Sequence, residues 1–366
     1  MSNPLLELKK HGQSVWYDDL NRKLIVTGTL QRMVDEDGVS GGTSNPSIFE
    51  KAVSSGSAYD EQMRKLVDKG RELPEIYDEL TVTDVRMATD VFRPIYDETE
   101  GADGYASLEV SPTIANDTQA SIEAAKRLFA ALDRPNAMIK IPGTRAGLPA
   151  ITHCIAAGIN VNVTLLFSIE RYAEVVEAFL AGMELRLERG LSIQAIGSVA
   201  SFFVSRVDAK VDALLARTAG HQLLGKIAIA NASMAYGIFE RTLNTPRWDK
   251  LAREGARPQR PLWASTSTKD PRLPDVYYVE ALAAPHTVNT LPPETFAAYR
   301  DHGNPVIRIR ESVAAAPAQL DALAEAGIDL KTVTCELEAD GVAKFAASYA
   351  AVLAGIDTKA GALAAR

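Results

Sequence analysis

The stretch 137–144, AMIKIPGT, places Lys140 inside a run of apolar residues that is typical of a buried strand. Side chains alternate between the two faces of a strand, so Ile139 and Ile141 should point away from the lysine, which then faces the interior of the fold. Burying an ammonium group is costly unless the group is paired or loses its proton. Burial therefore favours the free amine, which is the form that attacks a carbonyl carbon.

A carboxylate is expected beside this lysine. Glu109 belongs to the segment 105–112, YASLEVSP, which we predict to be the strand before that of Lys140, and Thr164 belongs to the strand after it. A carboxylic acid close to an amine can carry protons during formation and dehydration of a carbinolamine. This constellation favours Schiff-base chemistry. The alternative is a buried Lys–Glu ion pair that only holds two strands together.

Further polar groups lie in or near the ends of the other expected strands, where a barrel gathers its functional residues. They are Asp18, Asp19, Thr43, Ser44, Asn45, Ser111, Asn162, Ser198, Ser201, Arg206, Ser265, Thr266 and Lys269. Each has a structural alternative as well. Asn45 precedes Pro46 and could be an ordinary turn residue. Arg206 could pair with Asp208, and Lys269 could be an exposed loop cation.

The elements that must position these groups alternate along the chain. We predict eight strands, at 14–20, 38–46, 105–112, 137–143, 159–167, 191–203, 261–268 and 275–283. Helices are indicated between them, such as 117–133 after an Asn-Asp cap and 168–187 after a serine cap. This alternation predicts an α/β fold with a parallel sheet, and eight strands close into a (β/α)8 TIM barrel. A doubly wound open sheet is the alternative, but no GxGxxG follows the first strand and no Walker lysine is present.

Two segments exceed what a barrel needs. Residues 51–98 hold more than one helix between the second and third strands, and residues 310–366 are predicted to form C-terminal helices. Pro317 lies inside the first of these, and because proline is tolerated mainly in the first turn, we expect that helix to begin near it. Residues 1–366 should therefore form a single barrel domain with added helices. A separate C-terminal helical domain is the alternative.

Composition excludes several classes of protein. The 366 residues carry a net charge of −8 and a pI near 5.3, which argues against nucleic acid and membrane surfaces as partners. An anionic substrate must instead meet a local cluster of Arg and Lys. Cys154 and Cys335 lack metal-ligand spacing, which fits a reduced cytoplasmic protein without a zinc site. We find no signal peptide at the N-terminus and no window of transmembrane length, so we expect a cytoplasmic protein.

Six motifs occur in the order found in the transaldolase family, which the chain resembles from about residue 5 onward. They are SVWYDDLNR, GTSNPSIFEKA, SLEVSP, KIPGT, NVNVTLLFS and ASFFVSRVD. The later YVEAL…TVNTLP resembles the longer-chain form of the family, as in actinobacteria and cyanobacteria. The resemblance implies a metal- and cofactor-independent class I enzyme of the pentose phosphate pathway with a (β/α)8 barrel. Such an enzyme moves a dihydroxyacetone unit from sedoheptulose 7-phosphate to glyceraldehyde 3-phosphate.

The resemblance also implies roles for particular residues. Lys140 would form the Schiff base, and Asp18 would be the general acid/base at the C4 hydroxyl, with Asp19 as a close alternative. Glu109 would act with Thr164 through a water. The expected substrate-binding residues are Asn45, Asn162, Ser201, Arg206, Ser265 and Lys269, with Arg206 as the phosphate binder.

The chain departs from the family pattern at three points. Ser44 stands in TSNP where TTNP is common, which keeps a hydroxyl. Lys269 stands where some relatives have arginine. The segment AAPHTVNT places His286 near the expected barrel mouth, and we assign it no role.

Two rival functions stay open at this point. An aldolase of the same barrel class, such as a fructose-6-phosphate or deoxyribose-phosphate aldolase, would use the same lysine without needing an acceptor. The chain length and the motifs SVWYDDL and SLEVSP favour transaldolase, and Glu109 is the feature that discriminates the two. A non-catalytic phosphosugar-binding barrel would not need Lys140. Phosphorylated sugars are the expected partners in either enzyme, and the protein could be a monomer or a homodimer.

Overall fold

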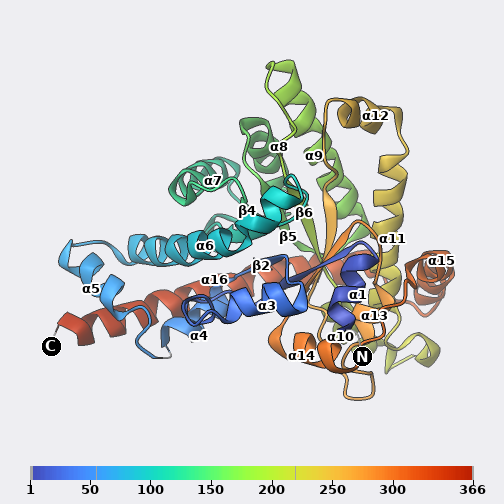
Figure 1. Ribbon diagram of the computed structural model, residues 1–366. Coiled ribbons are helices and arrows are strands. Elements are labelled where there is room, and N and C mark those ends of the chain that lie inside the picture. Colours follow the sequence, from blue (N-terminus) through green and yellow to red (C-terminus); the bar gives the residue numbers. More distant parts are fainter. Residues whose placement is uncertain (1–2, 55, 219, 365–366) are drawn as a thin grey trace.

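Eight parallel strands close into a barrel in chain order, with the last strand paired to the first. The computed structural model shown in Figure 1 describes residues 3–54, 56–218 and 220–364. The strands are β1 Gln13–Tyr17, β2 Gly41–Thr43, β3 Tyr105–Glu109, β4 Ala137–Pro142, β5 Val161–Leu166, β6 Ser198–Phe203, β7 Arg260–Ala264 and β8 Thr287–Leu291. The predicted (β/α)8 barrel is confirmed, and with it the parallel arrangement that places all strand carboxyl ends at one mouth.

Helices follow the strands and cover the barrel. In chain order they are α1 Pro4–Lys10, α2 Arg22–Val26, α3 Thr29–Asp37, α4 Pro46–Ser54, α5 Asp60–Asp68, α6 Leu73–Glu98, η1 Pro112–Ile114, α7 Thr118–Leu132, α8 Gly147–Ala157, α9 Ile169–Glu188, α10 Ser205–Leu215, η2 His221–Leu223, α11 Ile227–Leu243, α12 Pro246–Arg253, α13 Tyr277–Ala281, α14 Pro293–His302, α15 Ile309–Glu325 and α16 Leu330–Ala364. The two expected caps are present: Asp117 accepts from the backbone of α7 and Ser168 from that of α9. Both predicted helices are thus confirmed, because a capping side chain satisfies an otherwise unpaired N–H group.

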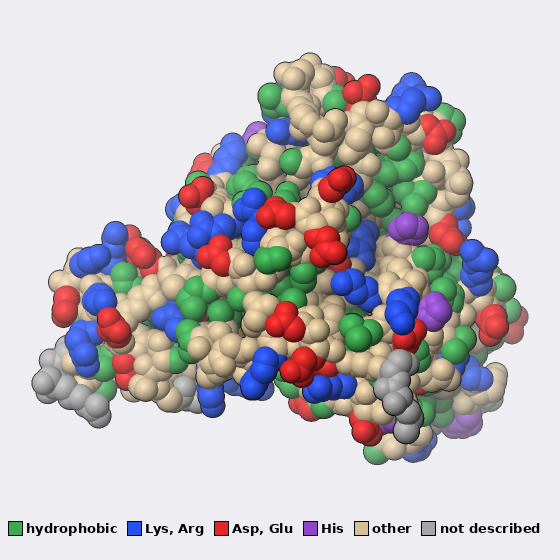
Figure 2. Space-filling model, in the orientation of Figure 1, with side chains coloured by type: hydrophobic (Ala, Val, Ile, Leu, Met, Phe, Trp, Pro, Cys, Tyr) green, Lys and Arg blue, Asp and Glu red, His purple; other side chains and the backbone are tan. Residues whose placement is uncertain are grey.

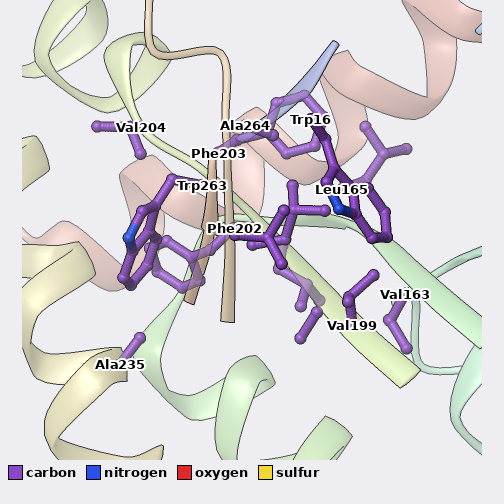
Figure 3. Close-up of a cluster of buried hydrophobic side chains, with 14 of the residues drawn as sticks. Trp16, Val163, Leu165, Val199, Phe202, Phe203, Val204, Ala235, Trp263 and Ala264 are labelled. Carbon is purple, nitrogen blue, oxygen red and sulfur yellow. The ribbon is translucent and has the colours of Figure 1, made fainter. Parts of the chain in front are cut away.

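The main hydrophobic core lies between the barrel and its helices. Phe202 of β6 packs edge-on against Trp263 of β7, with ring centroids 6.4 Å apart, and Ala235 of α11 lies beside them (Figure 3). Trp263 Nε1 donates to the carbonyl of Leu282 at 3.0 Å, so its polar atom is not left unpaired in the core. Burial of each such side chain contributes about 1.5–3 kcal/mol, which keeps the strands in the register that positions the mouth residues.

The expected eighth strand is wrong. Residues 275–283 contain the short helix α13, and β8 is the following segment TVNTL. An apolar run of this length does not distinguish helix from strand by periodicity alone, and Tyr278 and Leu282, four residues apart, share a buried helical face. The other strands are also shorter than predicted, most clearly β2, which occupies only part of 38–46, and β6, which occupies only the end of 191–203.

The expected start of the first C-terminal helix is also wrong. Helix α15 begins at Ile309 and runs through Pro317. A proline in a helix interior costs about 3 kcal/mol, because it lacks the N–H donor and crowds the preceding turn. The helix persists because Ile309, Ala316 and Leu323 are buried against the rest of the fold, and alanines around the proline favour helix.

Helices α4, α5 and α6 share a second hydrophobic cluster with α16, which runs along α6 away from the barrel (Figure 1). The cluster is rich in aromatic rings and includes Phe49, Tyr59, Tyr77 and Tyr349. Helix α16 is long and apolar enough over residues 330–363, by length and composition, to cross a membrane. The expectation that no window reaches that length is therefore wrong, because an 18-residue window of this alanine-rich helix carries at most 2 charged residues. In the folded protein, however, Tyr349 and its neighbours on one face of the helix pack against other helices.

Candidate active site

A cavity of about 430 Å³ opens at the carboxyl ends of the strands, where barrels place their functional residues. It gathers side chains from distant parts of the chain. Those predicted from the sequence that line it are Asp18, Asp19, Thr43, Asn45, Lys140, Ser201, Arg206, Ser265 and Lys269. Three more, Glu109, Asn162 and Thr164, are buried beside this lining. The barrel therefore brings the predicted catalytic and substrate-binding residues together at one mouth.

Lys140 lies where the alternation of its strand predicts. Ile139 and Ile141 are fully buried in the core, whereas the lysine reaches the cavity. Glu109 is its register partner on β3, and Lys140 Nζ lies 3.5 Å from Glu109 Oε2. The two side chains are only 6% and 2% exposed. This separation exceeds that of a charge-assisted hydrogen bond, and neither oxygen of Glu109 has a hydrogen-bond partner among the described residues.

The Glu109 carboxyl is poised to exchange a proton near neutral pH. Burial raises its pKa from 4.5 to about 7, against the opposing effect of the nearby Lys140 amine. The charge of Asp18 raises it further. A group whose pKa lies near the working pH can both donate and accept a proton, which suits a general acid/base.

Asp18 is the second acid at the mouth, and it is half-buried. Thr43 Oγ1 donates to Asp18 Oδ1 at 2.6 Å and lies 2.8 Å from the hydroxyl of Thr290 on β8. Burial raises the pKa of Asp18, whereas Lys140, the Thr43 hydrogen bond and Arg206 lower it. These interactions fix the carboxylate on the side of the cavity that faces Lys140.

Asp19 is half-buried and also lines the cavity. Burial also raises its pKa, but the other groups that act on it are Asn21, Asp18, Lys51 and Glu294, and not Lys140. The geometry therefore favours Asp18 over Asp19 as the acid that can act on a molecule bound at Lys140.

A hydrogen-bonded row of polar side chains crosses the barrel interior from β3 through β5 to β6. Asn162 Nδ2 donates to Ser107 Oγ at 3.0 Å, and Ser201 Oγ donates to Asn162 Oδ1 at 2.7 Å. Asn162 is also the register partner of Lys140 on β5. The row fixes the Asn162 amide, whereas the buried hydroxyl of Thr164 has no partner in the described part of the chain.

Arg206 and Lys269 line the cavity after the neighbouring strands β6 and β7, whereas Lys51 follows β2. On the face shown in Figure 2, acidic and basic side chains are interspersed, so any attraction for an anion depends on local groups. Arg206, in the first turn of α10, has its guanidinium carbon 5.2 Å from the ring centroid of Phe203. Lys269 is exposed and donates to Ser267 Oγ at 2.7 Å, and Ser265 precedes them in the same loop.

Arg206 does not form the ion pair with Asp208 that the sequence left open as an alternative. Asp208 instead accepts hydrogen bonds from the backbone N–H of Ala228 at 2.7 Å and from the hydroxyl of Tyr278 at 2.9 Å. No ion pair joins Arg206 to a carboxylate among the described residues. Its guanidinium is therefore available to a bound anion.

Asn45 has both of the roles considered for it. It lines the cavity, and its Oδ1 accepts from the backbone N–H of Ile48 at 3.1 Å at the start of α4. Ser111 instead lies close to Thr113, 2.8 Å between hydroxyl oxygens, and Thr266 donates to Asn289 at 3.1 Å. These two lie outside the cavity lining.

His286 lies at the opposite end of the barrel from the mouth. It directly precedes β8, and it lines a separate cavity of about 330 Å³ together with Ser198, Arg257 and Arg260. The expectation that His286 lies near the mouth is wrong because it follows from the misplaced eighth strand. Ser198 opens β6 and does not close it, so it too lies at the amino-terminal end.

Several residues of the cavity were not predicted from the sequence. Thr290 belongs to β8 and could have been found had that strand been placed correctly. Lys51 and Glu294 come from helices that follow β2 and β8, where nothing in the sequence separates them from ordinary surface charges. Phe345 comes from α16, and its ring centroid lies 6.0 Å from Lys140 Nζ. The helical spacing of Phe345 and Tyr349 indicates an apolar face but does not say what that face covers.

Within the described residues, no cluster of three or more His, Cys, Asp or Glu side chains is arranged to hold a metal ion. Lys140, Glu109 and Asp18 are placed for covalent and proton-transfer chemistry. The fold and the site together define a (β/α)8-barrel protein whose mouth presents a buried lysine–carboxylate pair beside a cationic rim.

The chain belongs to the transaldolase family. The sequence profile described as Transaldolase/Fructose-6-phosphate aldolase matches residues 15–356. A protein named Transaldolase from Acidothermus cellulolyticus is 50% identical over 361 residues, which cover 97% of this chain and 96% of that protein. One from Parafrankia sp. is 47% identical over the whole of both chains. A protein named Transaldolase 2 from Nostoc sp. is 45% identical over 98% of this chain and 97% of its own. The resemblance seen in the six motifs is thus confirmed.

Replacement of Glu109 should change how stability depends on pH. Because burial raises the pKa of Glu109 to about 7, the folded protein keeps this proton at pH values at which the unfolded chain has lost it. The linked stability is fully present below the unfolded pKa and is lost as the pH rises through about 7. Between about pH 5 and about pH 8, the free energy of unfolding should therefore fall in the wild type relative to Glu109→Gln, by on the order of 2 kcal/mol.

Urea unfolding followed by tryptophan fluorescence at several pH values measures this difference. A difference between the two proteins that does not change with pH would contradict a raised pKa at Glu109.

Proposed function

We propose that this protein is a transaldolase that acts through a Schiff base on Lys140. It would transfer a dihydroxyacetone unit from sedoheptulose 7-phosphate to glyceraldehyde 3-phosphate and yield erythrose 4-phosphate and fructose 6-phosphate. The observation that carries the proposal is the buried Lys140 amine, 3.5 Å from Glu109 and open to the cavity. Membership of the family and relatives named Transaldolase support it.

Formation of the imine begins with attack by the free amine of Lys140 on the C2 carbonyl of the ketose. The carbinolamine that results must gain a proton on its hydroxyl before water can leave. Glu109, whose pKa is raised to about 7, supplies and recovers this proton through a water shared with Thr164. The close register of β3 and β4 supports this role, because it holds the carboxyl beside the amine throughout the reaction.

Cleavage of the C3–C4 bond requires a base at the C4 hydroxyl. Asp18 accepts this proton, the aldose phosphate leaves, and the bonding electrons pass into the iminium to give an enamine on Lys140. The hydrogen bond from Thr43 orients the carboxylate. When an acceptor aldehyde arrives, the enamine carbon attacks its carbonyl, and Asp18 returns the proton to the new hydroxyl.

The remaining polar residues bind the substrate. Asn45 and Asn162 hold hydroxyls of the dihydroxyacetone unit, and Asn162 is itself fixed by Ser107 and Ser201. Arg206, assisted by Ser265 and Lys269, holds the phosphate. The distance of the phosphate from the reacting carbons allows its binding energy to serve orientation at Lys140.

We also propose that the enzyme works in the cytoplasm, as a monomer or homodimer, with sugar phosphates as its partners. Its two cysteines and its acidic charge support this setting. Neither nucleic acid nor a membrane is a partner in this proposal.

An assay with and without acceptor separates transfer from simple cleavage. The protein is incubated with fructose 6-phosphate, with or without erythrose 4-phosphate, and glyceraldehyde 3-phosphate is followed through a coupled dehydrogenase. Sustained release only with erythrose 4-phosphate is expected of a transaldolase. Sustained release without any acceptor would make the protein an aldolase and overturn the proposal.

Arg206 should contribute more to phosphate binding than Lys269. Arginine offers two parallel donors to phosphate oxygens, whereas lysine is a point charge, and Lys269 is exposed. Arg206→Ala should lower kcat/KM for fructose 6-phosphate by roughly 10- to 100-fold, the loss of one or two charge-assisted hydrogen bonds. Lys269→Ala should have a smaller effect.

The measurement is the ratio of kcat/KM for a phosphorylated donor to that for unphosphorylated fructose, which serves as the internal control. An equal ratio in the wild type and Arg206→Ala would remove this arginine from the phosphate site.

A further inference from the structure

Phe345 of α16 covers the amine on which the proposed reaction depends. Its ring centroid lies 6.0 Å from Lys140 Nζ, both side chains line the cavity, and the ring is only 5% exposed. An aromatic ring offers no strong hydrogen-bonding group to water on that side of the amine. The C-terminal helix thus contributes an apolar wall to a site that is otherwise built from strand ends.

Helix α16 is held across the mouth from opposite sides. On one side Glu336 pairs with Lys210 of α10, at 2.7 Å, and α10 follows β6. On the other side Ser348 lies 2.7 Å from Ser47 of α4, which follows β2. Because β2 and β6 stand opposite one another in an eight-stranded barrel, the helix must cross the mouth between them.

The helix also approaches the barrel closely at this point. Gly341, four residues before Phe345, lies so near β5 that an added Cβ would be 3.1 Å from Leu165. Tyr349, four residues after Phe345, packs edge-on against Tyr77 with ring centroids 4.9 Å apart. Residues spaced by four share one face of a helix. The contacts of Gly341 and Tyr349 therefore orient the face that carries Phe345 toward Lys140.

We propose that Phe345 is a specificity-determining residue that keeps water from the enamine and so makes the protein a transferase and not an aldolase. This inference rests on the proposed function. Release of free dihydroxyacetone consumes one water: the enamine carbon gains a proton, water adds to the resulting iminium carbon, and the C–N bond breaks to restore the Lys140 amine. Transfer consumes no water at this stage, because the enamine carbon attacks the carbonyl of the acceptor aldehyde and does not gain a proton. Exclusion of water therefore selects between the two outcomes.

The experiment compares Phe345→Ala with the wild type and with Val352→Ala. Val352 belongs to the same helix and is 1% exposed, but it lies in the second hydrophobic cluster, away from the cavity. With fructose 6-phosphate alone, the wild type should release a burst of about one glyceraldehyde 3-phosphate per site and then stop, because the enamine persists. Phe345→Ala should continue after the burst. The ratio of acceptor-free release to transfer should rise by roughly tenfold or more, whereas Val352→Ala should keep the wild-type ratio.

Two results would overturn the proposal: a ratio in Phe345→Ala that stays at the wild-type value, or an equal rise in Val352→Ala. If Phe345→Ala does not keep the near-ultraviolet circular dichroism of the folded protein, Phe345→Leu decides. Its ratio must then exceed those of the wild type and Val352→Ala, and equality contradicts the proposal. Failure of the proposed function is distinguishable, since it would appear in the wild type as absent transfer or as sustained release without acceptor.

Discussion

The close approach of Lys140 to Glu109 inside the barrel, 3.5 Å between Nζ and Oε2, constrains everything around it. An amine and a carboxyl so deeply buried are costly unless they share charge or a proton. Burial raises the pKa of Glu109 to about 7, so a proton can leave or return at little cost near neutral pH. Burial is costly for the charged pair, but it also lets the Glu109 carboxyl act in turn as proton donor and proton acceptor.

Two features of the fold meet this constraint: the register of β3 with β4, and the cover that helix α16 provides over Lys140. Parallel pairing of β3 with β4 places the two residues side by side, and the apolar neighbours of Lys140 anchor its strand in the core. Helix α16 then closes the space above them, with Phe345 over the amine. In the mechanism that we propose, Arg206 and Lys269 hold the anionic end of the substrate while its carbonyl meets the covered amine. On that proposal, the cover gives the enamine time to meet an acceptor.

Local sequence was sufficient for the strand of Lys140, for its pairing with that of Glu109, and for the helices capped by Asp117 and Ser168, because alternation and capping act over a few residues. It was insufficient for β8, since a short apolar run suits helix and strand alike. Because of that error, His286 was predicted at the wrong end of the barrel. The placement of Phe345 depends on contacts more than 200 residues apart in the chain, which no local pattern encodes. Likewise, only the fold shows that Asp208 bonds to Tyr278 and leaves Arg206 unpaired with it.

Covalent trapping tests most directly whether Lys140 is the nucleophile. Fructose 6-phosphate and borohydride are added together, and the digested protein is examined by mass spectrometry. The wild type should lose activity and carry a reduced adduct on the peptide that contains Lys140, and Lys140→Met should carry none. Asp18→Asn should still be labelled, but with the intact sugar phosphate, because the C3–C4 bond cannot break without its base. An adduct on Lys51 or Lys269, which share the cavity, or the absence of any adduct, would contradict the account.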